Sequence, residues 1–318
     1  MYSLGIDLGG TVIKTGVVDD DFNIIGRGAI PTNMPRPFDE IADDIAEACR
    51  MAAADAGIGL SDIKYAGIGT PGTVNPSTGI LEFAGNLGVH NYPLREALES
   101  RLGMEVYLEN DANAAAFGEA LAGAAKGCSD AVCITLGTGV GGGFIIGGRI
   151  FSGSNYAGTE IGHTCIVYDG LECNCGRKGC WEKYASASAL ISQTKEAMQA
   201  DPGSAMWGIA GSLDGVNGKT AYDGMRAGDP SAIAVVDQYH RYIACGIVNV
   251  INIFQPEVVC IGGGVSKEGS VIIDPIMEIV KKERFSKYSV KQTALVAATL
   301  GNDAGIIGAA NLYRGAIK

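Results

Sequence analysis

Short apolar runs alternate with turn residues at the start of the chain. The runs lie at Leu4 to Ile6, Val12 to Val18 and Ile24 to Gly28, and they are separated by Gly9-Gly10 and by Asp19-Asp20-Asp21. Apolar runs of this length, bounded by glycine and aspartate, are typical of strands joined by tight turns. The sequence therefore predicts that the fold begins with a three-stranded β-meander.

Helical and strand patterns alternate after this meander. Apolar residues recur at helical spacing from Asp39 to Ala56, and Gly57 ends the pattern. Strands are predicted at Tyr65 to Gly69 and at Val106 to Glu109, and the alanine-rich segment 112–125 favours a helix.

The second half of the chain repeats its opening. Ala131 to Leu136 has the pattern of a strand, GTGVGG that of a glycine turn, and Phe144 to Ile146 that of a second strand, so residues 4–18 and 132–146 look like copies of one motif. Three later elements are predicted, namely a helix from Ile233 to Phe254, a buried strand from Val258 to Ile261 and a last helix from Asp303 to Tyr313.

A duplicated β-meander followed by alternating strands and helices predicts an α/β fold of two lobes with a cleft between them. The repeat alone sets the boundary: residues 1–117 form a small lobe completed by the C-terminal helix 302–318, and residues 118–301 form a large lobe. The 318 residues, 47% of them hydrophobic, are enough to build two cores.

Charge and hydropathy exclude several classes of function. A net charge of -11 leaves no basic surface for a phosphate backbone, so nucleic acid is not an expected partner. No segment reaches membrane-spanning length, and an acid and glycines interrupt the apolar N-terminus before a signal sequence could form. We therefore expect a cytoplasmic protein without a membrane partner, whose nine cysteines are reduced and in part bound to metal.

The 47 glycines direct attention to three turns that end predicted strands. In each, backbone N–H groups can approach a phosphate or a nucleoside without obstruction by side chains. The turns are Gly9-Gly10-Thr11, Gly137-Thr138-Gly139 and Gly262-Gly263-Gly264.

Two other glycine patterns imitate nucleotide-binding motifs. Gly137, Gly139 and Gly142 spell G-x-G-x-x-G, but that fingerprint requires a helix, and the following FIIGGRIF has the pattern of a hairpin. Gly218-Lys219-Thr220 ends like a P-loop, but Leu213 occupies the place of the first glycine, so an ordinary loop is predicted.

A compact group of metal-ligand residues lies near the middle of the chain. His163, Cys173, Cys175 and Cys180 follow the spacing H-x9-C-x-C-x4-C, and two glycines between the last two cysteines let the chain fold back. Three thiolates and one imidazole make a closed tetrahedral zinc set, so the zinc loop 163–180 is expected to have a structural role. Cys165 is a possible fifth ligand, and the cysteines outside this loop are predicted to be buried in the core, at 49, 128, 133, 245 and 260.

Acidic residues flank this loop and one strand end. Asp111 lies between a predicted strand and a helix, where it would project from the end of a sheet, although capping the helix is an alternative role. Glu160 precedes His163 in E-x-x-H, and Glu182 follows the last cysteine of the loop. Carboxylates and an imidazole brought together by zinc are suitable hydrogen-bond partners for a polyol.

In these motifs the sequence resembles the ROK family of bacterial sugar kinases and regulators, and most closely its glucokinases. The resemblance covers nearly the whole chain. It rests on LGIDLGGTVIKTGVVD at the start, GTPG, FAGNLG at 83–88, ENDANAAAFGE at 109–119, LGTGVGGGFIIGGRIFSGSNYAGTEIGH at 136–163, CNCGRKGCWE at 173–182 and CIGGGVS at 260–266.

The resemblance implies an actin-like (ribonuclease H-like) sugar kinase fold, ATP and Mg²⁺, a hexose substrate, a structural Zn²⁺ held by the four cluster residues and a homo-oligomer, either a dimer or a tetramer. It implies that Asp111 is the catalytic base. The sugar would be bound by Gly72, Asn86, Asn110, Asp111, Glu160, His163 and Glu182. The nucleotide and its metal would be bound by the three glycine turns together with Asp7 and Lys14.

D-Glucose phosphorylated at its 6-hydroxyl is the expected substrate. The segment GVHNYPL at 88–94 departs from glucokinases, which often have tryptophan after NLG, so fructose, mannose, allose and N-acetylmannosamine remain alternatives. A non-catalytic sugar sensor and a nicotinamide-dependent enzyme are the other readings; Asp111 argues against the first and the predicted hairpin against the second.

Overall fold

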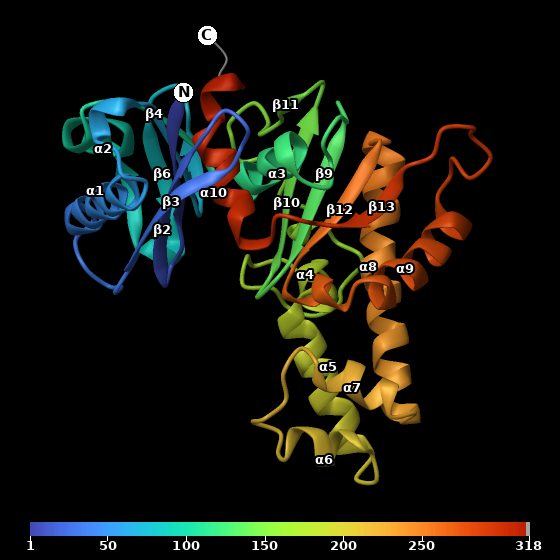
Figure 1. Ribbon diagram of the computed structural model, residues 1–318. Helices are drawn as coiled ribbons and strands as arrows, with labels where there is room; N and C mark the ends of the chain where they lie inside the picture. Colours follow the sequence, from blue (N-terminus) through green and yellow to red (C-terminus); the bar gives the residue numbers. More distant parts are fainter. Residues whose placement is uncertain (316–318) are drawn as a thin grey trace. The chain divides into compact units, whose positions relative to one another are not determined.

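The predicted meander forms one side of the first sheet in the computed structural model, which describes residues 1–315 (Figure 1). Three strands pair antiparallel, and two later strands extend the sheet in parallel to the first, giving the order β3-β2-β1-β4-β8. The strands are β1 (Tyr2–Leu8), β2 (Val12–Val18), β3 (Ile24–Pro31), β4 (Ile63–Thr70) and β8 (Glu105–Asn110).

A second sheet repeats this arrangement strand for strand. Its order is β11-β10-β9-β12-β13, so a meander is again followed by two added strands, and the predicted duplication is confirmed. The strands are β9 (Ala131–Leu136), β10 (Val140–Ile146), β11 (Arg149–Ile150), β12 (Val258–Gly263) and β13 (Ala294–Ala297). β10 and β11 form the hairpin that the sequence predicted in place of a dinucleotide-binding helix.

A third, smaller sheet was not predicted. It is an antiparallel arrangement of β5 (Thr73–Asn75), β6 (Ile80–Ala84) and β7 (Val89–Tyr92). The α-helices are α1 (Phe38–Asp55), α2 (Leu94–Leu102), α3 (Asp111–Ala122), α4 (Glu182–Ala185), α5 (Ala187–Ala200), α6 (Met206–Ala210), α7 (Thr220–Arg226), α8 (Pro230–Phe254), α9 (Ser270–Glu283) and α10 (Ala304–Ala310). Short 3-10 turns are η1 (Leu60–Asp62), η2 (Gly85–Leu87), η3 (Ile161–His163), η4 (Gly264–Glu268), η5 (Gly301–Asp303) and η6 (Leu312–Arg314).

The chain divides into two compact units. The first contains residues 1–133, 143–159 and the C-terminal segment from 298, and the second contains residues 134–142 and 160–297. Residues 118–133 and 143–159 thus group with the first unit, whereas the sequence assigned them to the large lobe. The helix α10 groups with the first unit.

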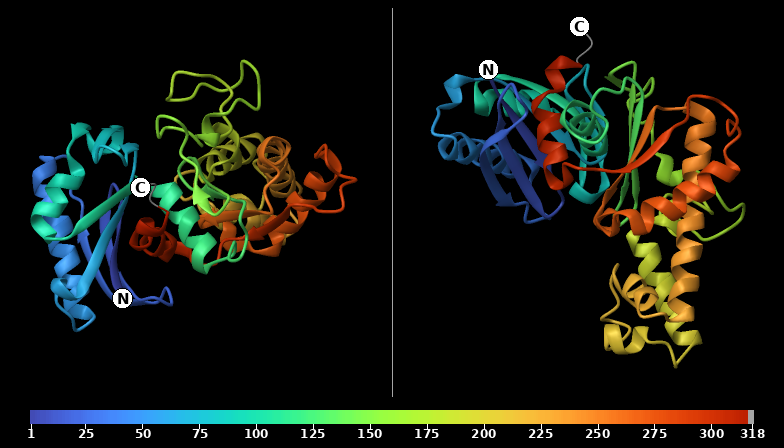
Figure 2. Two further views of the ribbon diagram at one scale, coloured as in Figure 1. Left: turned by 90° about the horizontal axis from the view of Figure 1, so that it is seen from above. Right: turned by 45° about the vertical axis from the view of Figure 1, so that its right-hand side comes forward.

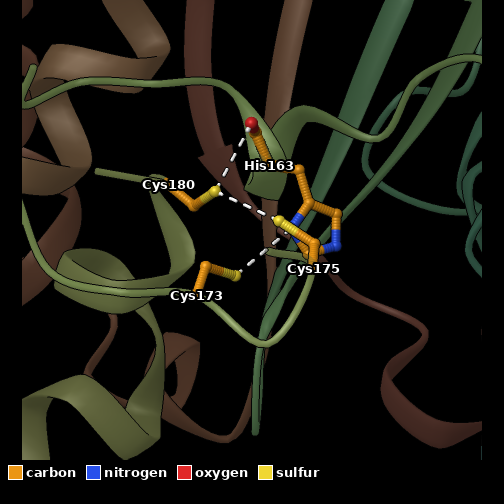
Figure 3. Close-up of side chains that lie close together, drawn as sticks. All are labelled: His163, Cys173, Cys175 and Cys180. Atoms are coloured by element: carbon orange, nitrogen blue, oxygen red, sulfur yellow. Dashed lines mark hydrogen bonds between the residues drawn. The ribbon is translucent and has the colours of Figure 1, made fainter. Parts of the chain in front are cut away.

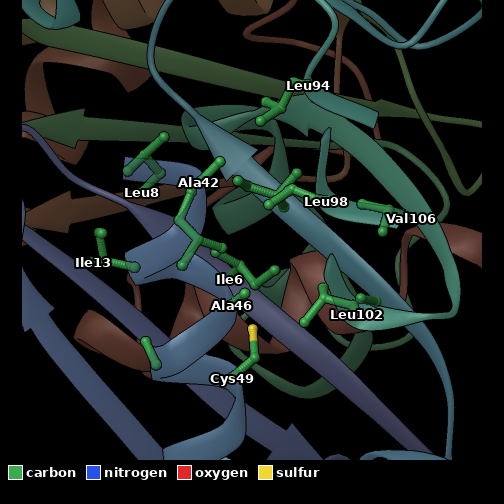
Figure 4. Close-up of a cluster of buried hydrophobic side chains, with 14 of the residues drawn as sticks. Ile6, Leu8, Ile13, Ala42, Ala46, Cys49, Leu94, Leu98, Leu102 and Val106 are labelled. Atoms are coloured by element: carbon green, nitrogen blue, oxygen red, sulfur yellow. The ribbon is translucent and has the colours of Figure 1, made fainter. Parts of the chain in front are cut away.

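The core of the first unit lies between its sheet and the helices α1 and α2 (Figure 4). The apolar residues whose helical spacing predicted α1 are buried. A hydrogen bond also joins α1 to the sheet, because the hydroxyl of Thr15 on β2 donates to the carbonyl of Ala48 on α1 at 2.7 Å. Isoleucine, leucine and alanine side chains fill this layer, among them Ile6, Leu8, Ile13, Ala42, Ala46, Leu94, Leu98 and Leu102.

Glycines let helices lie directly on the other face of this sheet. A β-carbon on Gly5 would come within 1.9 Å of the carbonyl oxygen of Ile306, so α10 rests on the backbone of β1. A β-carbon on Gly308 would come within 1.7 Å of the carbonyl oxygen of Ala114, so α10 also crosses α3 at backbone contact. This packing fixes the helix that carries Asp111.

Several local expectations need correction. The helix predicted over 112–125 ends at Ala122 and is followed by Gly123, and β10 begins at Val140 inside the glycine motif instead of after it. All nine cysteines are free, but Cys128 and Cys245 are half-buried instead of core residues. Among the residues that the structure describes, no helix is long and apolar enough to cross a membrane.

Candidate functional site

Asp111 lies where the sheet of the first unit meets a helix. β8 ends at Asn110 and α3 begins at Asp111. The side-chain oxygen of Asn110 accepts the backbone N–H groups of Ala112 (2.9 Å) and Asn113 (3.2 Å), so Asn110 is the residue that caps the helix. Burial raises the pKa of Asp111 above its ordinary value of 3.8, and the N–H of Ala112 only partly opposes this effect. Asp111 is half-buried, and a partly desolvated carboxylate with a raised pKa is suited to accept a proton.

A second acid, Asp7, lies near the end of β1 in the same unit. It faces Lys14 across the hairpin, and the Lys14 Nζ lies 4.0 Å from its Oδ2. Burial raises the pKa of Asp7, the charge of Lys14 lowers it, and the charge of Asp111 raises it. The two carboxylates are therefore close enough to interact electrostatically.

The glycine turn that follows Asp7 is closed by its own backbone. The N–H of Gly9 donates to the carbonyl of Val12 at 3.1 Å, while Gly10 and Thr11 are exposed at the tip. A β-carbon on Gly10 would lie 3.8 Å from the side-chain nitrogen of Asn86. The structure therefore brings a predicted sugar-binding residue beside the predicted phosphate turn.

The remaining sugar residues predicted in the first unit contact each other. The Nδ2 of Asn110 donates to the carbonyl of Gly72 at 3.2 Å. Gly72 has φ of 95° and its β-carbon would meet the carbonyl oxygen of Phe83 at 2.0 Å, so no other residue fits there. Asn110 thus connects the GTPG loop to the start of α3.

The two predicted nucleotide turns of the second unit end neighbouring strands. Residues 137–139 follow β9, while Gly262 and Gly263 are the last two residues of β12, which is next to β9 in the sheet, and Gly264 follows them. A β-carbon on Gly263 would lie 2.3 Å from the carbonyl oxygen of Leu136, and one on Gly139 would lie 2.5 Å from a carboxylate oxygen of Glu182. The turn at 137–139 therefore lies against a predicted sugar ligand.

The four predicted metal ligands converge in the second unit (Figure 3). Their ligand atoms all lie within 4.8 Å of one another. The sulfurs of Cys175 and Cys180 are 3.6 Å apart, and the sulfur of Cys173 is 3.7 Å from Nδ1 of His163. A tetrahedral zinc ion with bonds of about 2.3 Å to sulfur and 2.0 Å to nitrogen requires edges of roughly 3.5 to 3.8 Å, so this donor set fits zinc.

Backbone geometry holds the loop closed around this set. The N–H of Cys173 donates to the carbonyl of Arg177 at 2.8 Å, and Cys165 pairs with Cys180 in an isolated β-bridge. Gly179 has φ of 76°, and its β-carbon would meet the carbonyl oxygen of Val167 at 1.8 Å. Cys165 is not one of the four converging residues, so the possible fifth ligand is not part of this group.

Glu182 connects the metal loop to the predicted sugar site. Its Oε1 lies 3.0 Å from the sulfur of Cys173 and 3.7 Å from Nδ1 of His163. The preceding Trp181 is fully buried, and its indole N–H donates to the carbonyl of Tyr242 on α8 at 2.7 Å. The longest helix of the unit therefore anchors the residue before Glu182. Glu160 lies just before η3, where its carbonyl accepts the N–H of His163 at 3.1 Å.

Two features of the first unit were not found from the sequence. Glu109 is 7% exposed and accepts the side chain of Asn113 at 3.0 Å, so a second buried acid supports the start of α3, and burial raises its pKa. Thr159, the residue before Glu160, has φ of 67°, which is strained for a β-branched side chain. Strand alternation does not indicate the first, because it places Glu109 on the face of Glu105 and Tyr107 and not with the buried Val106 and Leu108. No local pattern indicates the second.

The chain is similar to known sugar kinases along its full length. It matches the model of the ROK family over residues 3–316. It is 40% identical to a glucokinase of Streptomyces coelicolor over 98% of this chain and 97% of that protein, and 36% identical to a glucokinase of Thermotoga maritima over 98% and 96%.

Solved structures give the same result. A ROK family glucokinase from Streptomyces griseus, in complex with glucose and AMPPNP, is 38% identical with a TM-score of 0.84 over 99% of this chain and 100% of that one. A ROK hexokinase from Thermus thermophilus is 33% identical with a TM-score of 0.81 over 98% and 97%. The predicted actin-like α/β sugar kinase fold is confirmed, and this chain belongs to the ROK family.

Proposed function

We propose that this protein is a glucokinase, which transfers the γ-phosphoryl group of ATP to the 6-hydroxyl of D-glucose. The observation that carries the proposal is Asp111, a partly buried carboxylate at the start of α3 whose pKa desolvation raises. Similarity to glucokinases over nearly the full length supports the choice of reaction.

In this reaction Asp111 accepts the proton of the 6-hydroxyl as its oxygen attacks the γ-phosphorus and the bond to the β-phosphate oxygen breaks. The turns at 9–11 and 137–139 present backbone N–H groups to the phosphates, and the turn at 262–264 lies near the nucleoside. Mg²⁺, when bound with ATP, neutralises charge on the phosphates. Asp7 is the carboxylate that would orient the water ligands of Mg²⁺. Lys14 balances the negative charge of Asp7.

Hydrogen-bonding groups would bind the sugar ring. The proposed ligands are Gly72, Asn86, Asn110, Asp111, Glu160, His163 and Glu182. His163 has Nδ1 turned to the cysteines, which leaves Nε2 for a sugar hydroxyl. Zinc, held by His163, Cys173, Cys175 and Cys180, would orient this loop and has no open position for water. We also propose that the protein works as a homo-oligomer.

A coupled assay with ATP and a panel of hexoses tests the substrate. Glucose is expected to give a higher kcat/KM than mannose, fructose, allose or N-acetylmannosamine, because an epimer that leaves a sugar-binding carboxylate without its hydroxyl partner loses roughly 1 to 3 kcal/mol. A higher value for one of the other sugars would reject glucose but keep the kinase. Binding of sugars with no phosphorylation of any would instead indicate a sugar sensor.

A further inference from the structure

Gly139 lies against the carboxylate of Glu182, although the sequence assigns the glycine to a nucleotide turn and the acid to the sugar. A β-carbon on Gly139 would lie 2.5 Å from Oε2 of Glu182, which is closer than two such atoms approach each other in proteins. Within the described residues, and apart from those adjacent to the glycine, only the carboxyl carbon of Glu182 also lies within 4 Å of that position, at 3.7 Å. The carboxylate therefore occupies the space that a side chain at 139 would need.

The backbone of the turn does not itself require glycine at this position. Neither Gly137 nor Gly139 has the positive φ that favours glycine, so an L side chain is compatible with both backbones. A β-carbon on Gly137 would meet no atom within 4 Å. Two glycines of one turn thus differ in a single respect, namely that Gly139 faces the carboxylate of Glu182.

The carboxylate is also held on its other side. Oε1 of Glu182 lies 3.0 Å from Sγ of Cys173 and 3.7 Å from Nδ1 of His163, and the side chain is 21% exposed. One oxygen is therefore directed to the metal loop and the other to the nucleotide turn. A methyl group at 139 would force the carboxylate out of this orientation.

The backbones that carry the two groups are fixed relative to each other. The carbonyl of Gly137 accepts the N–H of Ala187, the first residue of α5, at 2.8 Å. A β-carbon on Gly246 of α8 would lie 2.1 Å from the indole of Trp181, so the residue before Glu182 rests on the backbone of α8. The helix α8 in turn lies beside α5 (Figure 2). A clash at 139 would therefore move the carboxylate and not the helix that carries it.

We propose that Gly139 is a positioning residue for the sugar. Because it has no side chain, the carboxylate of Glu182 can lie against the nucleotide turn, in the orientation that binds the hydroxyls of glucose. The inference rests on the proposed role of Glu182 as a sugar ligand, and it makes one glycine of a nucleotide turn a determinant of sugar affinity. A carboxylate turned away from its hydroxyl partner loses a charge-assisted hydrogen bond.

Calorimetric titration with D-glucose in the absence of nucleotide tests the inference, because the phosphate-binding role of the turn does not contribute to that measurement. The variant G139A should raise the Kd for glucose by at least about tenfold. The matched control G137A adds a methyl group to the same turn and should keep this Kd within about twofold of the wild-type value. E182A should also weaken glucose binding, and G139A/E182A should differ from E182A by less than about twofold, since the added methyl group then has space.

Circular dichroism shows which variants are folded. If G139A does not fold, a folded G139A/E182A would still support the clash with Glu182, whereas an unfolded one would overturn the inference, because the turn itself would then require glycine. Equal losses of glucose affinity in G137A and G139A would overturn it too. Wild-type affinity in G139A beside weak binding in E182A would reject the role of Gly139 alone. Wild-type affinity in E182A would reject Glu182 as a sugar ligand and the inference with it, and the hexose panel tests the kinase reaction separately.

Discussion

At the scale of single residues, the candidate site contains acids that the fold partly shields from water. Burial raises the pKa of Asp111, Asp7 and Glu109, and each of them is therefore less favourable as a charged group than it would be in water. The sequence suggests Asp111 as the base because the residues of the motif ENDANAAAFGE are adjacent in the chain. It could not show the interaction of Asp111 with Asp7, since that depends on how β1 and β8 are placed in one sheet.

Replacing Asp111 by asparagine should separate activity from stability. The amide keeps the shape of the side chain but cannot accept the proton. We therefore expect kcat to fall by about 10²-fold to 10⁴-fold, while the KM for glucose changes by less than about tenfold. A carboxyl whose pKa is raised by folding costs stability once it is ionised, so the same variant should have a higher Tm at neutral pH. Asp237→Asn, an exposed substitution on α8, is the control and should change neither the kinetic constants nor the Tm. Retained activity in the Asp111 variant would reject it as the base.

The raised pKa of Asp111 also predicts the acid side of the pH profile. The base must be ionised, so kcat/KM should fall as the pH drops through the pKa of Asp111, at a pH higher than the 3.8 of an ordinary aspartate. The measurement is kcat/KM for glucose across the acid range, with circular dichroism at each pH to exclude unfolding. A folded enzyme whose kcat/KM is unchanged down to pH 4 would contradict this assignment.

At the scale of elements, local patterns were predicted well and irregular ones were not. Both meanders follow from apolar runs and glycine turns, and the metal loop follows from four ligands within 18 residues of sequence. The hairpins of 73–92 were missed because their strands have three to five residues and include asparagine, glutamate and histidine. Such strands depend on pairing with each other, which no single-segment pattern reports.

The metal loop can be tested with two cysteines that lie close together. Cys175→Ser should lower zinc from one ion per chain to well below that value by elemental analysis, and should weaken glucose binding, because the loop that carries Glu182 loses its anchor. Cys165→Ser is the matched control, since Cys165 lies in the same loop but outside the converging ligands, and it should retain zinc. Equal zinc contents in the two variants, or a zinc-free wild-type enzyme with full activity, would exclude the site.

At the scale of the whole molecule, each unit is assembled from segments distant in the sequence. The first unit contains residues from both ends of the chain, and Glu119 binds the C-terminal segment that begins at residue 298. This buried side chain accepts the N–H groups of Ala124, Thr299 and Leu300 at 2.8 to 3.2 Å, together with the hydroxyl of Thr299. The sequence could not show this contact, because it joins residues 180 positions apart.

Glu119→Gln should therefore destabilise the protein. An amide group in place of one carboxylate oxygen presents N–H donors to N–H donors, so we expect the free energy of unfolding to fall by about 2 to 4 kcal/mol in urea titrations. Glu278→Gln, an exposed change on α9, is the control and should cost less than about 0.5 kcal/mol. Equal stabilities of the two variants would show that Glu119 does not fasten this segment.

The position of α10 on β1 has a consequence for synthesis in the cell. The ribosome makes β1 almost three hundred residues before it makes α10. Until then Gly5 of β1 and Gly67 of β4, which lie against the backbone of α10, lack that helix, although α3 can already lie against Gly69 of β4. The nascent first unit can form its meander but cannot complete its packing until the last helix emerges. Chaperone binding to the growing chain is therefore most useful throughout elongation, and the final folding step should coincide with release of the chain.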